Sequence, residues 1–189
     1  HGTLTEVASI GSSGGADTIS AGSGVNRIIG GADRDTIELK SGDNVVIGDN
    51  GRATFNQATG ALSSAETIDP AIGDADLITA LGGHAVVLGG AAGDSIDIGE
   101  GTGVVVGDGG KVIYSGNLVD VVQSVGTQGG ADTITAGSGD NRIIGGADQD
   151  RITIGNGNNI VIGDNGLADF DNQSGVLVEL RTTDAGVGD

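Results

Sequence analysis

A nine-residue pattern of polar and aliphatic positions runs along most of the chain. In residues 129–164 an Asp or Asn recurs every nine residues, and each is followed two positions later by Ile or Val. The residues between these pairs are rich in glycine, which adopts the positive-φ conformations of tight turns without steric cost. Each repeat therefore predicts a six-residue turn followed by a three-residue strand with one aliphatic side chain pointing inward.

Two such nonamers form one 18-residue coil with a turn on each side, and stacked coils place their strands in two parallel sheets around a thin aliphatic core. Further segments keep the period only loosely, and we interpret them as longer coils with protruding hairpins that turn near 56–60, 115–117 and 171–175. The predicted fold class is all-β. It is a parallel β-solenoid, or β-roll, of about ten coils, in which 18-residue coils alternate with longer hairpin-bearing coils.

The nonamers are grouped into larger modules. GGADTI occurs at 14–19 and again at 129–134, an offset of 115 residues, and a weaker copy lies between them. We therefore expect an excerpt of a tandem array, with further copies of the repeat in the same chain as its main partners. The predicted units are 1–13 (end of a preceding module), 14–72 (module A), 73–128 (module B), 129–187 (module A) and 188–189 (start of the next module).

Aliphatic residues also occupy the strand positions that should point outward on one of the two sheets. Period-2 alternation directs them away from the thin core, and an apolar surface of this extent is uncommon on a soluble monomer unless something covers it. Either the hairpins fold over this face or a second chain pairs with it laterally. The three aromatic residues recur once per module and are expected to point inward, namely Phe55, Tyr114 and Phe170.

Carboxylates recur at positions that this fold would stack. Turns alternate sides, so residues 18 apart lie about 4.8 Å apart on one edge. Unneutralised carboxylates at that spacing repel one another, and Ca²⁺ accepts six to eight oxygen ligands, carbonyls included. One Asp in a Gly-rich turn is typically only a turn residue, but six copies at fixed spacing favour several Ca²⁺ ions. The candidate ligands on this edge are Asp17, Asp35, Asp76, Asp94, Asp132 and Asp150, joined by Asp33, Asp49, Asp74, Asp108, Asp148 and Asp164.

The opposite edge carries amides instead of carboxylates. Asn26, Asn44, Asn141 and Asn159 occupy the corresponding position in modules A, whereas module B has an alanine and a glycine there. These four residues are also candidate metal ligands. A ladder of Asn side chains that hydrogen-bond along the solenoid axis explains them equally well, so both interpretations stay open.

Three nonamers carry a recognisable resemblance. Gly30–Glu38 (GGADRDTIE), Gly89–Asp97 (GGAAGDSID) and Gly145–Thr153 (GGADQDRIT) resemble the RTX, or haemolysin-type, calcium-binding repeat G-G-x-G-x-D-x-U-x, where U is aliphatic. The resemblance implies that the first six residues form a turn that holds Ca²⁺ and the last three a short strand. It further implies a tandem array within a large secreted bacterial protein that is exported unfolded. Asp33 and Asp148 depart from the pattern, because they stand at its fourth position, where the pattern has glycine.

Charge and composition exclude several functions. A net charge of −18 argues against nucleic acid and anionic membranes as partners, and the longest apolar runs are far short of the roughly 18 residues of a membrane span. With no Cys and two His, the chain offers oxygen ligands and little for zinc or copper. The carboxylates recur in every module, whereas a catalytic site would occur once. We therefore expect neither an enzyme nor a small-molecule substrate.

The sequence thus predicts a calcium-binding structural segment of a long, secreted, extracellular or cell-surface protein, such as a fibre, an adhesin stalk or a matrix component. The alternative is a carbohydrate- or ice-binding β-solenoid module, because rows of Thr are expected on one sheet face.

Overall fold

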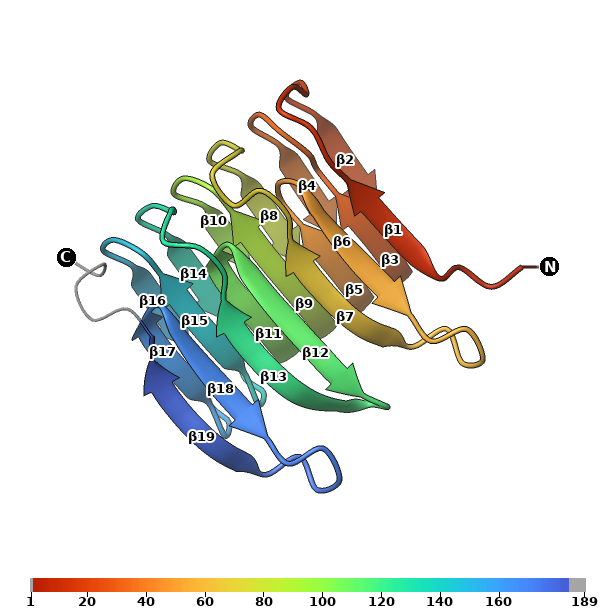
Figure 1. Ribbon diagram of the computed structural model, residues 1–189, viewed down its shortest axis with the longest axis vertical. Coiled ribbons are helices and arrows are strands. Elements are labelled where there is room, and N and C mark those ends of the chain that lie inside the picture. The colour runs from red at the N-terminus through yellow and green to blue at the C-terminus, as the bar shows by residue number, and fades with distance from the viewer. Residues whose placement is uncertain (1, 184–189) are drawn as a thin grey trace.

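The computed structural model describes residues 2–183 as three layers of β-sheet (Figure 1). Two sheets are parallel and one is antiparallel, and no helix occurs among these residues. Accordingly, the described part of the chain has no helix capable of crossing a membrane.

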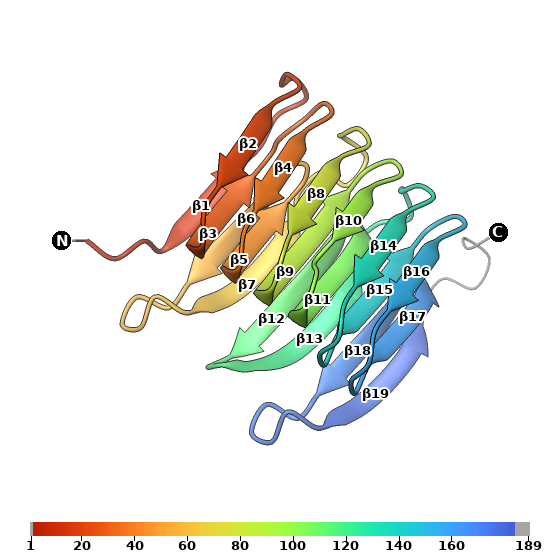
Figure 2. The same cartoon turned by 180° about the vertical axis from the view of Figure 1, so that it is seen from behind.

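The outer sheet is parallel, and its six strands follow one another in chain order (Figure 2). Its short strands each place one isoleucine in the core, and these isoleucines are in register, as in the pairs Ile19↔Ile37 and Ile37↔Ile78. The strands are β2 (Thr18–Ala21), β4 (Thr36–Leu39), β8 (Leu77–Ala80), β10 (Ser95–Asp97), β14 (Thr133–Ala136) and β16 (Arg151–Ile154).

The middle sheet is also parallel and six-stranded, and each of its strands follows an outer-sheet strand to complete one coil. It is sandwiched between the other two sheets, which explains why its strands read as continuous apolar runs and not as an alternation. The strands are β3 (Gly24–Ile29), β5 (Gly42–Ile47), β9 (Gly83–Gly90), β11 (Gly101–Asp108), β15 (Arg142–Gly146) and β17 (Ile160–Asp164).

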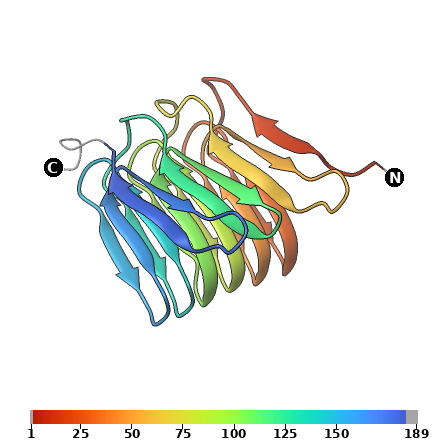
Figure 3. The ribbon, with the colours of Figure 1, turned by 60° about the horizontal axis from the view of Figure 1, so that its bottom comes forward.

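The third layer, the hairpin sheet, is antiparallel and covers the middle sheet (Figure 3). Its hairpins are inserted between middle-sheet and outer-sheet strands, and each hairpin pairs with the hairpin of the adjacent module. Its strands are β1 (Glu6–Ser9), β6 (Gly51–Phe55), β7 (Leu62–Thr67), β12 (Gly110–Ser115), β13 (Leu118–Ser124), β18 (Gly166–Phe170) and β19 (Leu177–Thr182).

The predicted count of about ten coils is wrong: residues 2–183 form six coils. The loosely periodic segments do not form coils of their own, because each leaves the stack as a hairpin, and the first two return to it at the same edge. The parallel sheets consequently continue past the insertion without a gap, as β4 pairs directly with β8 and β5 with β9. The all-β class and the presence of hairpins are confirmed.

Two apolar cores result from this three-layer arrangement. Val46, Val87 and Val105 of the middle sheet pack toward the outer sheet, whereas their neighbours, such as Ile47 and Val106, pack against the hairpin sheet. The hairpins of the same chain therefore cover the aliphatic face of the middle sheet. Of the two predicted covers, the intramolecular one is confirmed for this face.

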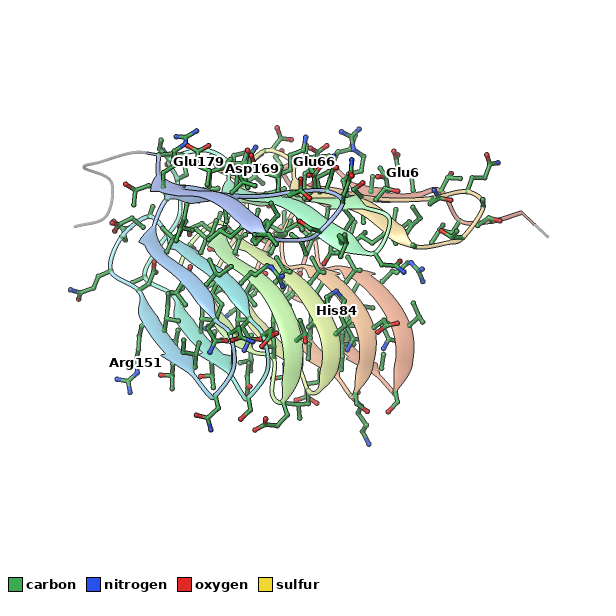
Figure 4. All side chains as sticks on the ribbon, turned by 90° about the horizontal axis from the view of Figure 1, so that it is seen from below. Glu6, Glu66, His84, Arg151, Asp169 and Glu179 are labelled. Carbon is green, nitrogen blue, oxygen red and sulfur yellow. The ribbon has the colours of Figure 1, made fainter. Side chains whose placement is uncertain are left out.

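The aromatic residues lie beneath the hairpin sheet. Phe55 and Phe170 are buried and Tyr114 is half-buried, so the predicted inward orientation is confirmed. Each phenylalanine ring carries an arginine guanidinium from the middle sheet, at 4.3 Å for Arg27 over Phe55 and 5.0 Å for Arg142 over Phe170. Cation–π contacts of this kind link arginines of the middle sheet to phenylalanines on the inner face of the hairpin sheet. The solvent side of the hairpin sheet is charged, and Figure 4 shows Glu6, Glu66, Asp169 and Glu179 there.

Ile47 tests the contribution of the second core, because its side chain is fully buried between the middle and hairpin sheets. Replacing it with alanine should reduce the free energy of unfolding in calcium by about 2–5 kcal/mol, as expected for a buried cavity. Val178→Ala, at a side chain 67% exposed on β19, is the control and should change the value by less than about 0.5 kcal/mol. Equal urea midpoints for the two variants would contradict the hairpin cover.

Candidate metal centre

A ladder of aspartates runs along one edge of the roll, which we call the Asp edge. Asp35 closes the turn between β3 and β4 and is fully buried. Its Oδ1 accepts the backbone N–H of Asp17 from the preceding coil at 2.7 Å, and its own N–H donates to Asp76 Oδ1 at 2.7 Å. The same bond links the remaining coils in turn, from Asp76 to Asp94, Asp94 to Asp132 and Asp132 to Asp150.

The second carboxylate oxygen of each ladder residue has no hydrogen-bond partner although it is buried. A Cβ on Gly30, which precedes Asp35 in the turn, would stand 2.2 Å from Asp35 Oδ2 and 2.3 Å from the carbonyl oxygen of Gly48. The glycine thus leaves room for a carboxylate oxygen and a carbonyl oxygen to converge. The unpartnered oxygens are the Oδ2 atoms of Asp35, Asp76, Asp94, Asp132 and Asp150.

This convergence repeats along the whole edge. Gly48, Gly89, Gly107 and Gly145 each bring the next ladder Oδ2 and the next turn carbonyl within 2.5 Å of their missing Cβ. Two acceptors that face each other in a buried place are unfavourable unless a proton or a cation lies between them. Oxygen donors of this kind, charged and neutral together, suit Ca²⁺.

Burial raises the pKa of the ladder carboxylates well above the usual aspartate range of about 3.9. The effect is largest for Asp94, where desolvation raises the pKa to about 10 despite a backbone hydrogen bond that lowers it. For Asp132 and Asp76 desolvation raises the pKa to about 8 and about 7, and for Asp150 to about 6. A bound cation would remove this penalty, because it favours the charged form.

The other predicted ligands divide into two groups. Asp49 and Asp108 are buried where the chain leaves for a hairpin, and their carboxylates accept backbone N–H groups of later turns, from Ala91 at 2.5 Å and from Gly130 at 2.9 Å. Asp49 Oδ1 has no partner. The remaining residues are exposed: Asp17, Asp33, Asp74, Asp148 and Asp164.

Backbone carbonyls have to provide much of any coordination sphere here. Within residues 2–183 no three His, Cys, Asp or Glu side chains converge on one point. Asp33 and Asp148 adopt positive φ values of 71° and 66° at the position where the nonamer pattern has glycine, which directs the chain through the turn. Their ligand roles stay predictions.

On the opposite edge, the Asn edge, the amides are hydrogen-bonded. Asn26 Nδ2 donates to Asn44 Oδ1 at 2.8 Å, and the backbone N–H of Asn141 donates to Asn159 Oδ1 at 3.0 Å. The predicted metal role of these four residues therefore competes with an amide ladder that the structure contains.

Sequence reasoning missed a polar pair at the Asn edge. His84 is half-buried, and its Nε2 lies 3.1 Å from the Tyr114 hydroxyl. Burial lowers the pKa of His84. The two rings line a groove of about 690 Å³ between the hairpin and middle sheets. Only the placement of Tyr114 in the aromatic position of its module hinted at this contact.

Comparison with known families agrees with the geometry of the Asp edge. Residues 12–46 and 127–161 match the family model described as the RTX calcium-binding nonapeptide repeat (4 copies). These two segments are RTX repeats, and the chain accordingly binds multiple Ca²⁺ ions. The RTX repeat is a structural calcium-binding repeat and not a catalytic family. No curated protein and no solved structure matched the chain.

Asp94 lies near the middle of the ladder and tests the assignment of ligands. Asp94→Ala should reduce the number of bound Ca²⁺ ions. At a calcium concentration 100 times the Kd the lost site removes about 2.7 kcal/mol, which lowers the melting temperature by about 5–11 °C. Asp43→Ala, at an exposed carboxylate near the Asn edge, is the control for charge removal. Unchanged calcium binding in Asp94→Ala would refute the ligand assignment.

The raised pKa values predict that acid stabilises the metal-free fold. A carboxyl whose folded-state pKa exceeds its unfolded value contributes stability that is complete below about pH 3.9 and is lost as pH rises through the folded-state pKa, here about 6 to 10. While such a group stays protonated in the fold, each pH unit costs about 1.4 kcal/mol. The metal-free chain should therefore show more β-structure by far-UV circular dichroism at pH 5 than at pH 8.

Asp94→Asn supplies the control for this pH dependence, since its amide does not titrate and the difference between pH 5 and pH 8 should shrink. A metal-free protein that is more stable at pH 8 would show that the ladder is solvated and not buried.

Proposed function

We propose that this chain, which carries RTX calcium-binding nonapeptide repeats, is a structural segment of a long extracellular tandem-repeat protein and is held folded by Ca²⁺ along its Asp edge. The observation that carries this proposal is the row of five buried Oδ2 atoms without partners, which follows the roll from coil to coil. RTX repeats are typical of secreted bacterial proteins, which supports a location outside the cell.

Calcium and folding form one equilibrium in this proposal. The unfolded chain holds no preformed site, so the free energy of metal binding contributes directly to folding. Extracellular calcium modules typically bind with a Kd of about 10⁻⁴ to 10⁻³ M. A chain with a net charge of −18 would then remain expanded at cytosolic calcium concentrations and fold after export, where calcium neutralises it.

The pairing of the hairpin sheet supports a tandem array. β1 pairs with β6 in the antiparallel manner in which β7 pairs with β12 and β13 with β18. β1 thus occupies the place that a strand of an adjacent hairpin takes elsewhere in this sheet. At the other end β19 exposes Val178 and Leu180, a surface suited to the hairpin of a following copy. The predicted start of that copy, residues 188–189, lies outside the described residues.

A stalk, a fibre or a matrix component would use this segment as a spacer whose rigidity depends on calcium. Stacked coils can be added without limit, and each new hairpin extends the cover of the middle sheet. Lateral pairing of such chains is a further possibility that the charged outer side of the hairpin sheet opposes.

The alternative function, carbohydrate or ice binding, would use the free face of the outer sheet. Thr18 pairs with Thr36, and Thr135 pairs with Thr153, so polar side chains do form two rows there. Leu77, Asp97 and Arg151 interrupt these rows. An interrupted face is poorly suited to a regular lattice, and we therefore place this function second.

Small-angle X-ray scattering tests the calcium-held spacer. In millimolar Ca²⁺ the chain should have a radius of gyration of about 16 Å, and after chelation the value should approach about 46 Å, the value for an unfolded chain of this length. Mg²⁺ at the same concentration is the control, because it dehydrates reluctantly and demands octahedral geometry. A compact particle in the chelator at neutral pH would rule out calcium-driven folding.

A further inference from the structure

The two edges of the roll use one and the same side-chain placement. Along the Asp edge, and at Asn141 and Asn159 on the Asn edge, the Oδ1 atom accepts the backbone N–H of the equivalent residue one coil earlier. Asp150 Oδ1 receives the N–H of Asp132 at 2.9 Å, and Asn159 Oδ1 receives the N–H of Asn141 at 3.0 Å. The two ladders therefore differ mainly in their other terminal atom, which is an oxygen on the Asp edge and an NH₂ group on the Asn edge.

The identity of this second terminal atom determines which partner each edge requires, a hydrogen-bond acceptor for NH₂ or a cation for the carboxylate oxygen. Asn44 Nδ2 donates to the carbonyl oxygen of Lys40 at 3.0 Å, and Asn141 Nδ2 donates to the carbonyl oxygens of Gly137 and Gly139, both at 3.2 Å. The amide hydrogens of the asparagine side chain thus satisfy carbonyl oxygens of its own turn. On the Asp edge the second terminal atom is a bare carboxylate oxygen, and it lies beside a glycine carbonyl oxygen of a following turn, as Asp35 Oδ2 does with Gly48.

Hydrogen-bond satisfaction separates the edges in the same way. Asn44 and Asn141 are almost fully buried. Nevertheless, among residues 2–183 the buried side-chain atoms without a partner include five Oδ2 atoms of the Asp ladder and no atom of Asn26, Asn44, Asn141 or Asn159. A buried acceptor that lacks a donor requires a cation. The four asparagines present no such unpartnered acceptor.

Backbone bonds also close the turns of the Asn edge directly. The N–H of Gly42 donates to the carbonyl oxygen of Gly82 at 3.3 Å, and the N–H of Gly82 donates to that of Ile98 at 3.1 Å. The first link joins module A to module B and the second lies within module B, where Ala85 and Gly103 replace the asparagines. At its last coil module B is joined to the next module by two further bonds, from the N–H of Gly103 to Asn141 Oδ1 at 3.0 Å and from the N–H of Ser138 to Glu100 Oε2 at 2.8 Å.

We propose that the Asn edge is built without metal and that Ca²⁺ binds only along the Asp edge. The side-chain amides occupy the position and satisfy the carbonyls that a cation would otherwise take, so the donor set on this edge does not fit Ca²⁺. The predicted metal role of the four asparagines is replaced by this hydrogen-bonding role. The inference rests on the proposed calcium-held fold and adds to it that one edge of each coil closes independently of calcium.

Counting bound calcium by isothermal titration and equilibrium dialysis tests the inference. Asn159→Ala removes a half-buried amide near the end of the ladder and should lower the melting temperature in calcium while the number of bound ions stays that of the wild type. The loss of an ion would overturn the inference. If Asn159→Ala does not fold, Asn26→Ala at the other end of the ladder takes its place with the same two outcomes.

The reciprocal change is Asp132→Asn, which places an amide in the Asp ladder. The variant should bind fewer Ca²⁺ ions than the wild type, and at pH 8 its metal-free form should fold at a lower concentration of the osmolyte trimethylamine N-oxide than the metal-free wild type does. Equal stability of the metal-free variant and the metal-free wild type would contradict the inference that an amide can take the place of a cation in the ladder. A wild-type chain that binds no calcium would defeat the proposed function itself, whereas calcium binding with an ion lost in Asn159→Ala defeats only the metal-free Asn edge.

Discussion

The fold depends on a row of buried carboxylate oxygens that face carbonyl oxygens with no hydrogen between them. Five of the six coils contribute one such contact, between a glycine at the end of a middle-sheet strand and an aspartate that precedes the next outer-sheet strand and whose Oδ1 accepts a backbone N–H of the preceding coil. Removing a carboxylate from water costs several kcal/mol unless it is compensated. The contact is thus unfavourable in the bare chain and favourable once Ca²⁺ joins the two oxygens, which makes folding conditional on the metal.

A roll of two thin sheets would leave the aliphatic outer side of the middle sheet in water. The hairpin sheet solves this by covering that side with strands from the same chain and so creates the second apolar core. The apolar cores and the Asp edge thus have separate roles. Apolar burial supplies most of the stabilisation, and the Asp edge determines when the coils can stack and bury that apolar surface. Charged residues remain on the solvent side of the hairpin sheet (Figure 4).

Much of this architecture could be predicted from the nonamer period. The position of Ile two residues after each Asp indicated the core of the outer sheet, and the 18-residue spacing predicted the ladder that joins Asp76 to Asp94. The period could not show whether a loosely repeating segment forms a coil or leaves the stack. That depends on strand partners supplied by the adjacent module, and the predicted coil count was therefore wrong.

The candidate site was predictable only in part for a related reason. Spacing identified the ladder carboxylates, but it gave equal weight to Asp33, which is exposed, and to Asp35, which is fully buried. Burial and the direction of a side chain follow from the turn conformation, here a positive φ at Asp33. On the other edge the sequence left metal and hydrogen bonding open for asparagine, because the two differ only in where the amide hydrogens point.

Far-UV circular dichroism during a calcium titration of the metal-free chain at pH 8 tests the central claim most directly. The account predicts that β-structure is absent in the chelator and appears cooperatively as Ca²⁺ is added, over the same concentration range in which the ions bind. A full β-sheet spectrum before any calcium is added would contradict it, because the Asp edge would then be stable without a cation.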